Sequence, residues 1–165
     1  MIYYLIASIL IAVTALFART KRAVLAAGIL FYAVRIAAAG LLLWGGLYDT
    51  TSAAFFTFDA LGTLFYLLLV VVSMYVFGHS EAYLQGEDLR SYRLYFALLM
   101  LLTTAIAGAY FANNLAVTWI FLEATTLCSA GIIYHRRTAQ ALEAAWKYVF
   151  VCSTGIAMAY LGILL

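Results

Sequence analysis

The sequence contains no proline and little charge. None of its 165 residues is proline and only 10% are charged, whereas globular proteins average about 5% proline and about 25% charged residues. The absence of proline removes the usual sequence signal for a kinked or broken helix. A hydrophobic share of 68% excludes an ordinary soluble domain. The net charge of +2 comes from short loops and gives no support for nucleic-acid binding.

Cysteine and histidine are also scarce. The two cysteines, Cys128 and Cys152, both fall in apolar segments and are interpreted as small buried hydrophobic residues. A metal site needs more ligands than the sequence places near them. A glycine-rich nucleotide loop and a nucleophile–base pair are missing as well. Redox or hydrolytic chemistry is therefore not expected on this chain.

Long apolar runs fill most of the sequence. They predict an all-α, polytopic membrane protein. Six transmembrane helices are predicted at residues 2–17, 23–47, 59–77, 94–111, 114–134 and 143–165. The first run has no basic segment before it and no small-residue cleavage site within it, so it is interpreted as a retained helix and not as a signal peptide.

One polar stretch interrupts this pattern. Residues 78–93, GHSEAYLQGEDLRSYR, are too polar to span a bilayer and are expected to lie along the cytoplasmic membrane surface. The stretch divides the chain into two parts. Residues 1–93 hold the first three helices and this surface segment, and residues 94–165 hold the last three helices.

Basic residues gather in alternate loops. Those after the first, third and fifth predicted helices contain Arg19, Lys21, Arg22, Arg90, Arg93, Arg136 and Arg137, and those after the second and fourth contain no basic residue. The positive-inside rule places the basic loops in the cytoplasm. Both ends of the chain are then predicted to lie outside.

The most informative charge is Glu123, in the middle of the fifth predicted helix. It follows Asn114 by about 14 Å of helix, which is close to the midplane of a hydrocarbon core about 30 Å thick. A charge there costs about 3 kcal/mol on insertion, so the carboxylate must face protein, water or a partner charge. Its helical face contains Ala116, Trp119, Thr126 and Ala130. These side chains allow close packing or a water molecule.

Two interpretations of Glu123 remain open. Desolvation favours a protonated carboxyl group and a nearby cation favours the carboxylate, so alternation between the two environments would load and release a proton. Alternatively, Glu123 is a structural carboxylate that is hydrogen-bonded to a neighbouring helix.

Two further charges begin the sixth predicted helix. Glu143 and Lys147 are spaced for an i, i+4 pair on one face. Lys147 is either a functional cation or a side chain that extends to the membrane interface. Glu143 alone fits the acidic residue that a helix N-terminus favours.

Four other residues carry weaker signals. Arg35 lies near the middle of the second predicted helix, where an arginine requires a carboxylate or a backbone carbonyl. It is interpreted as part of a structural pair or as a contact with another subunit. Asp59 fits an acidic helix start. His79 and His135 are predicted to lie in solvated loops, with proton transfer as the alternative.

Two motifs resemble a known family. The run WIFLEATTLCSA (residues 119–130), followed by ALEAAWKY (residues 141–148), resembles the antiporter-like membrane subunits of respiratory complex I and its relatives. In that family a fifth-helix glutamate, followed by small and polar residues, precedes a sixth helix with an AAxK motif. The resemblance covers residues 58–165 and is weak before them. It is closest to the membrane-bound nickel-iron hydrogenases of the formate hydrogenlyase (hydrogenase 4) type, although Leu122 stands where many members have tryptophan.

The resemblance implies a role in redox-driven translocation of protons or sodium ions. Glu123 would be the channel glutamate and Lys147 the sixth-helix lysine, with Glu143, Arg35, Asp59 and His135 as possible supporting residues. Family members have some fourteen helices in two inverted repeats of five. This chain resembles only the N-terminal part and lacks the seventh-helix lysine, so it is interpreted as a split subunit or a fragment.

The resemblance also implies partners. Other membrane subunits would supply the later helices, and a peripheral redox module would carry the iron–sulfur clusters and the nickel-iron or flavin group. The chain itself would be a non-catalytic subunit of an oxidoreductase complex in the cytoplasmic (inner) membrane of a bacterium or archaeon. The alternatives are a structural scaffold between pumping subunits and, as a third class, a stand-alone cation/proton antiporter.

Overall fold

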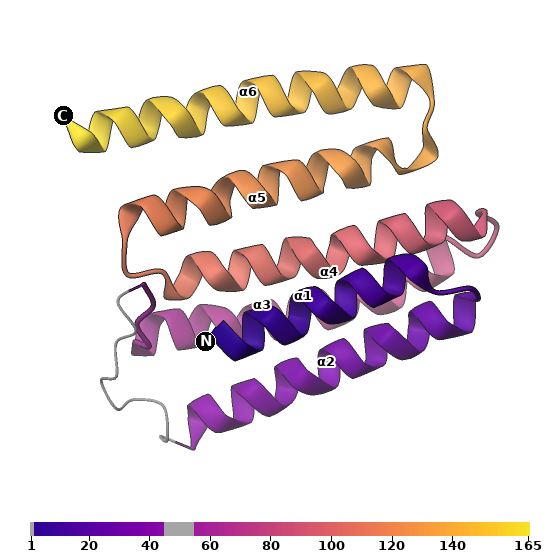
Figure 1. The fold of residues 1–165 in the computed structure, drawn as a ribbon, viewed down its shortest axis with the longest axis horizontal. Helices are drawn as coiled ribbons and strands as arrows, with labels where there is room; N and C mark the ends of the chain where they lie inside the picture. Colours follow the sequence, from indigo (N-terminus) through magenta and orange to yellow (C-terminus); the bar gives the residue numbers. More distant parts are fainter. Residues whose placement is uncertain (1, 45–54) are drawn as a thin grey trace.

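The protein is a bundle of long helices whose axes run nearly side by side (Figure 1). The computed structural model describes residues 2–44 and 55–165. The helices are α1 (Ile2–Phe17), α2 (Lys21–Leu43), α3 (Ala60–Tyr83), α4 (Leu89–Phe111), α5 (Leu115–Ile133) and α6 (Ala139–Leu164), with a 3₁₀ turn η1 (Tyr134–Arg136) after α5. The prediction of an all-α membrane protein is confirmed for these residues. The end of the second predicted helix, at residue 47, lies outside them.

Five of these helices, α2 to α6, are long and apolar enough to cross a membrane. The apolar helix α1 has 16 residues and is therefore about 24 Å long, which is shorter than the ~30 Å of a hydrocarbon core. Six helices are present as predicted, but length and composition support only five spans among the described residues.

The polar stretch 78–93 is mostly helical and is shared between two helices, while its location at the membrane surface stays a prediction. Its first residues continue α3 to Tyr83, and its last residues begin α4 at Leu89. Only a short turn separates them, in which the Glu87 amide donates to the Leu84 carbonyl at 3.1 Å. Polar residues can prolong a helix beyond the apolar core because the backbone hydrogen bonds are made within the helix. Hydropathy marks where a span ends, not where its helix ends.

Side-chain caps explain where four helices begin. Thr20, Asp59, Asn114 and Thr138 each accept a hydrogen bond from a backbone amide in the first turn of α2, α3, α5 and α6. Such caps satisfy amides that have no partner within the helix. Asp59 is therefore the start of α3, as predicted. The Thr138 cap places the start of α6 at Ala139, one turn earlier than the apolar pattern indicates.

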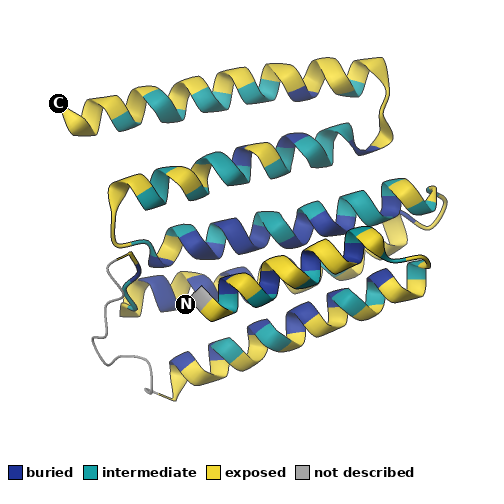
Figure 2. Ribbon diagram, in the orientation of Figure 1, coloured by how far each residue is buried: buried dark blue, intermediate teal, exposed yellow. Residues whose placement is uncertain are grey.

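Helix α4 is the centre of the bundle. It packs against α1, α2, α3 and α5, whereas α6 lies outermost and contacts α5 and η1. Burial accordingly declines from α4 through α5 to α6 (Figure 2). Helix α5 approaches α4 closely because the Phe121 ring lies over Gly108, where a Cβ atom would be 2.3 Å from Cε1 of the ring. The packing on α4 therefore sets the position of α5.

Three connections meet at one end of the bundle, which we name the basic end: α1–α2, α3–α4 and α5–α6. Glu87 joins them, because its carboxylate pairs with Arg136 Nε at 3.1 Å and its carbonyl accepts from Lys21 Nζ at 2.8 Å. Arg93 Nη1 donates to the Ala18 carbonyl at 3.0 Å. The basic loops thus share one end of the structure, and their cytoplasmic location stays a prediction.

Candidate functional site

Glu123 lies on α5 at its contact with α6. Its Oε2 atom accepts a hydrogen bond from the Ser153 hydroxyl of α6 at 2.9 Å, and its side chain is half-buried. Of the face predicted around it, Thr126 and Ala130 are buried whereas Ala116 is exposed. The sequence requires a protein or water contact for this carboxylate, and the structure supplies a hydroxyl group.

The surroundings of this hydrogen bond are apolar. On the side away from the basic end, the Trp119 ring packs on Tyr160 at 5.5 Å between ring centroids. Between Glu123 and the basic end, a groove of about 380 Å³ runs between α5 and α6, lined by residues such as Ala130 and Trp146. Among the described residues, Ser153 and Glu123 make the one side-chain hydrogen bond between these two helices.

Lys147 lies on a different face of α6. It pairs with Glu143 at 2.6 Å, as the i, i+4 spacing allows, and the two side chains are 74% and 67% exposed. Ala145 between them is buried against α5, and residues two positions apart on a helix point in nearly opposite directions. The structure therefore does not bring Lys147 and Glu123 together. It directs the Glu143–Lys147 pair outward from the bundle.

Arg35 is fully buried among α1 to α4. Its Nη2 atom donates to the Thr103 carbonyl of α4 at 3.2 Å, so a backbone carbonyl is one of its partners, as the sequence analysis allowed. Its guanidinium lies 5.3 Å from the centre of the Phe31 ring and 5.7 Å from that of Tyr66. No carboxylate of the described residues pairs with it. Arg35 belongs to the four-helix part of the bundle and not to the contact between α5 and α6.

Neither histidine lies in a solvated loop, so that prediction was wrong. His79 is part of α3 and stacks on Tyr75, with 6.4 Å between ring centroids. His135 is buried in η1, where Nδ1 bonds the Ile132 carbonyl at 2.8 Å and the ring packs on Tyr95. The reason is that the helical backbone continues past the apolar runs in both places. His135 stands about 18 Å along the helix from Glu123.

Ser153 is the contact that sequence analysis missed. It sits in an apolar run next to Thr154 and Gly155, and a serine in such a run is compatible with simple helix packing. The sequence did contain one signal for this contact, a hydroxyl side chain in the apolar run that follows the helix of Glu123. Among the residues that the structure describes, no cluster of three or more His, Cys, Asp or Glu side chains could hold a metal ion.

Ser153→Ala is expected to lower the free energy of unfolding by about 1 kcal/mol, because the Glu123 carboxyl group loses its hydroxyl donor in an apolar contact. Equilibrium unfolding in bilayer nanodiscs measures the change. Ser129→Ala, the same substitution on the neighbouring helix α5, is the control and should leave the stability unchanged. Equal stabilities of the Ser153→Ala and parent proteins would contradict the hydrogen bond.

Comparisons with known proteins give one informative match. No family model matches the chain, and no solved structure matches it. The chain is 30% identical, over 115 residues, to a protein of Methylacidiphilum infernorum (isolate V4) described as a hydrogenase-4 component F homolog. The match includes 66% of this chain and 24% of that protein, so the chain spans about a quarter of the length of the curated relative. The chain therefore combines apolar helices long enough to cross a membrane with similarity to part of a hydrogenase-4 component F homolog.

Proposed function

We propose that the chain is an ion-translocating membrane subunit, or a split part of one, in a redox-driven complex of the hydrogenase or complex I type. Its helices would form the start of an inverted-repeat transporter fold in the cytoplasmic membrane, with both chain ends outside. The observation that carries the proposal is a half-buried carboxylate, Glu123, held by Ser153 at the contact of two apolar helices of membrane-spanning length.

Glu123 is the proton carrier in this proposal. In the proton-loaded state the neutral carboxyl group can donate a hydrogen bond to the Ser153 hydroxyl or accept one from it. When a cation approaches, the carboxylate form is favoured and the proton leaves. The hydroxyl keeps the side chain in one orientation in both states. Sodium ions could bind the same carboxylate in place of the proton. The experiments must therefore also identify which ion is moved.

The approaching cation must come from outside the described contact. Lys147 faces away from Glu123 and is paired with Glu143. A lysine or arginine on a partner membrane subunit therefore completes the site in this proposal. Electron transfer belongs to a peripheral redox module with its own metal or flavin groups, and charge movement in the membrane couples the two.

A scaffold role is the second candidate, and the Ser153 contact is the observation that favours it. A carboxyl group that donates or accepts one fixed hydrogen bond can simply join α5 to α6. In that case the chain packs between pumping subunits, and the ratio of ions moved to electrons transferred does not depend on Glu123.

Carbodiimide labelling of the assembled complex in vesicles tests the proposal. Dicyclohexylcarbodiimide reacts with protonated carboxyl groups in apolar surroundings, so an adduct is expected on Glu123 and not on Glu143, which is exposed and paired with Lys147. Ion movement should stop as the adduct forms, while electron transfer to a soluble acceptor continues. Undiminished ion movement at complete labelling of Glu123 would favour the scaffold role.

A further inference from the structure

A buried polar layer crosses the middle of the four-helix part of the bundle. It contains at least one residue from each helix: Ser8 of α1, Arg35 of α2, Ser73 of α3, and Thr103 and Thr104 of α4, all at most 5% exposed. On the side of the basic end lies one apolar cluster, which includes Ala12, Val24, Phe31, Phe96 and Met100. On the other side lies a second, which includes Leu5, Ala39, Val70, Ala107 and Phe111. The layer is thus enclosed by apolar packing at both ends.

Arg35 is the charged side chain of this layer, and no carboxylate of the described residues neutralises it. Arg35 has five N–H donors on three nitrogens, and its one hydrogen bond to protein goes from Nη2 to the Thr103 carbonyl. Its Nε and Nη1 atoms are buried and have no hydrogen-bond partner. The ion pairs of the described residues, at Glu87 and Glu143, involve other cations.

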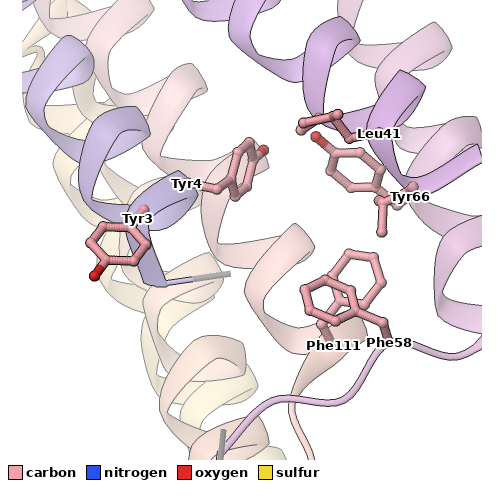
Figure 3. A pocket seen from close by; sticks show the side chains of 8 residues that line it. Tyr3, Tyr4, Leu41, Phe58, Tyr66 and Phe111 are labelled. Atoms are coloured by element: carbon pink, nitrogen blue, oxygen red, sulfur yellow. The ribbon is translucent and has the colours of Figure 1, made fainter. Parts of the chain in front are cut away.

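The neighbouring polar groups add hydroxyl donors and no negative charge. The Tyr4 hydroxyl and the Ser8 hydroxyl are buried without a hydrogen-bond partner, and the two residues are one turn apart on α1. The centre of the Tyr66 ring lies 5.9 Å from that of Tyr4 and 5.7 Å from the Arg35 guanidinium. Figure 3 shows the hydroxyls of Tyr4 and Tyr66 directed toward each other. The Tyr66 hydroxyl donates to the Arg35 carbonyl, and the Nε and Nη1 atoms of the guanidinium stay without a hydrogen-bond partner.

From this arrangement we infer that the polar layer is a binding site for one small monovalent anion, of which chloride is the common example. A guanidinium and two hydroxyl groups, all buried and with free donors, form a set that lacks only an acceptor with negative charge. Buried charges in proteins are paired or neutralised, and arginine cannot lose its proton. Arg35 is fully buried among α1 to α4, so a side chain of another subunit does not reach it. A diffusible ion can.

A hollow at the end of the bundle opposite the basic end shares Tyr4 and Tyr66 with the surroundings of this layer, and we place the path of the ion there. The hollow has a volume of about 330 Å³ and is walled by Tyr4, Tyr66, Leu42, Phe58 and Phe111 (Figure 3). Tyr66 links the two, since it lines this space and its ring lies 5.7 Å from the Arg35 guanidinium. Rotation of the Tyr4 side chain, which is only half-buried, would open the path for an ion of atomic size and close it again.

The test is the thermal stability of the full chain in nanodiscs of neutral lipid, as sodium gluconate is replaced by sodium chloride or bromide at constant ionic strength. Gluconate is too large for the site. The midpoint of unfolding is expected to rise by an amount on the order of 5 °C at saturating halide. Arg93→Met is the control, because it removes another arginine that donates to a backbone carbonyl. This variant should show the same rise as the parent protein, which would exclude Arg93 as the cation responsible.

Variants at Arg35, Tyr4 and Ser8 test which groups bind the halide. Arg35→Met should abolish the halide-dependent rise. Tyr4→Phe and Ser8→Ala keep the cation and each remove one donor, so the halide concentration for half of the rise should increase roughly 3- to 10-fold. Ser8→Asp supplies a covalent carboxylate at the layer, and this variant should be stabilised without halide and insensitive to it.

Equal midpoints in gluconate and halide for the parent protein would overturn the inference, and so would a halide effect that persists unchanged in Arg35→Met. If Arg35→Met does not fold, the Tyr4→Phe and Ser8→Ala proteins decide the question. Unchanged halide dependence in both of them would exclude this site.

Discussion

Vesicles that contain the Glu123→Gln protein within its complex should transfer electrons without accumulating ions. Glutamine has nearly the shape of glutamate and can still bond the Ser153 hydroxyl, which lies 2.9 Å from Glu123 Oε2, so α5 and α6 should stay packed. It cannot bind and release a proton. Positioned proton transfer contributes about 100-fold or more to the rate of a reaction that depends on it, and we expect a loss of ion movement of at least that order. A pH-sensitive dye and a sodium electrode follow the two candidate ions.

Two matched variants show whether the loss is specific. Glu143→Gln removes a carboxylate that is 67% exposed and paired with Lys147, and it should leave the ratio of ions to electrons unchanged. Glu123→Asp keeps an acidic group but shortens its reach to Ser153, so it should retain part of the activity. A normal ratio in Glu123→Gln would mean that this chain is a scaffold. A loss of electron transfer in the same variant would mean that the substitution disturbs assembly.

The helices could be predicted from the sequence because a bilayer imposes long apolar runs on it. Their ends could not be predicted equally well, since caps and not hydropathy determine them. Thr138 begins α6 before the apolar run does, and α3 continues through polar residues to Tyr83. The position of the loops at a common end could be inferred from charge alone. The contact that holds them there, at Glu87, depends on which loops meet in space.

The residues of the candidate site could likewise be predicted only in part from the sequence. Glu123 could be found because a charge in an apolar run is costly. Its partner Ser153 could not, since a serine carries no signal of its own and thirty residues of chain separate the two. Arg35 shows the same limit. Its place in the middle of an apolar run was evident from the sequence, but the hydroxyls near it come from α1 and α3, and only the packing of four helices brings them together.

The packing of α5 on α4 rests on Gly108, and Gly108→Val is expected to destabilise the protein by about 3 kcal/mol, at the upper end of overpacking costs. A Cβ atom at this position would lie 2.3 to 2.6 Å from three atoms of the Phe121 ring. The ring also packs on Phe56 at 6.0 Å, so it cannot turn aside without losing another contact. We expect α5 to move away from α4 and to carry Glu123 with it. Equilibrium unfolding in nanodiscs measures the loss.

Two controls separate this clash from a general effect of valine in a helix. Gly40→Val places the same side chain on α2 where no atom lies within 4 Å of a Cβ, and its stability should match that of the parent protein. Phe121→Ala in the Gly108→Val background removes the obstructing ring, so the double variant should be more stable than the sum of the two single losses predicts. Strict additivity would show that the two side chains do not meet. In that case the position of Glu123 would depend on other contacts of α5, such as the close approach of Leu98 to Gly131.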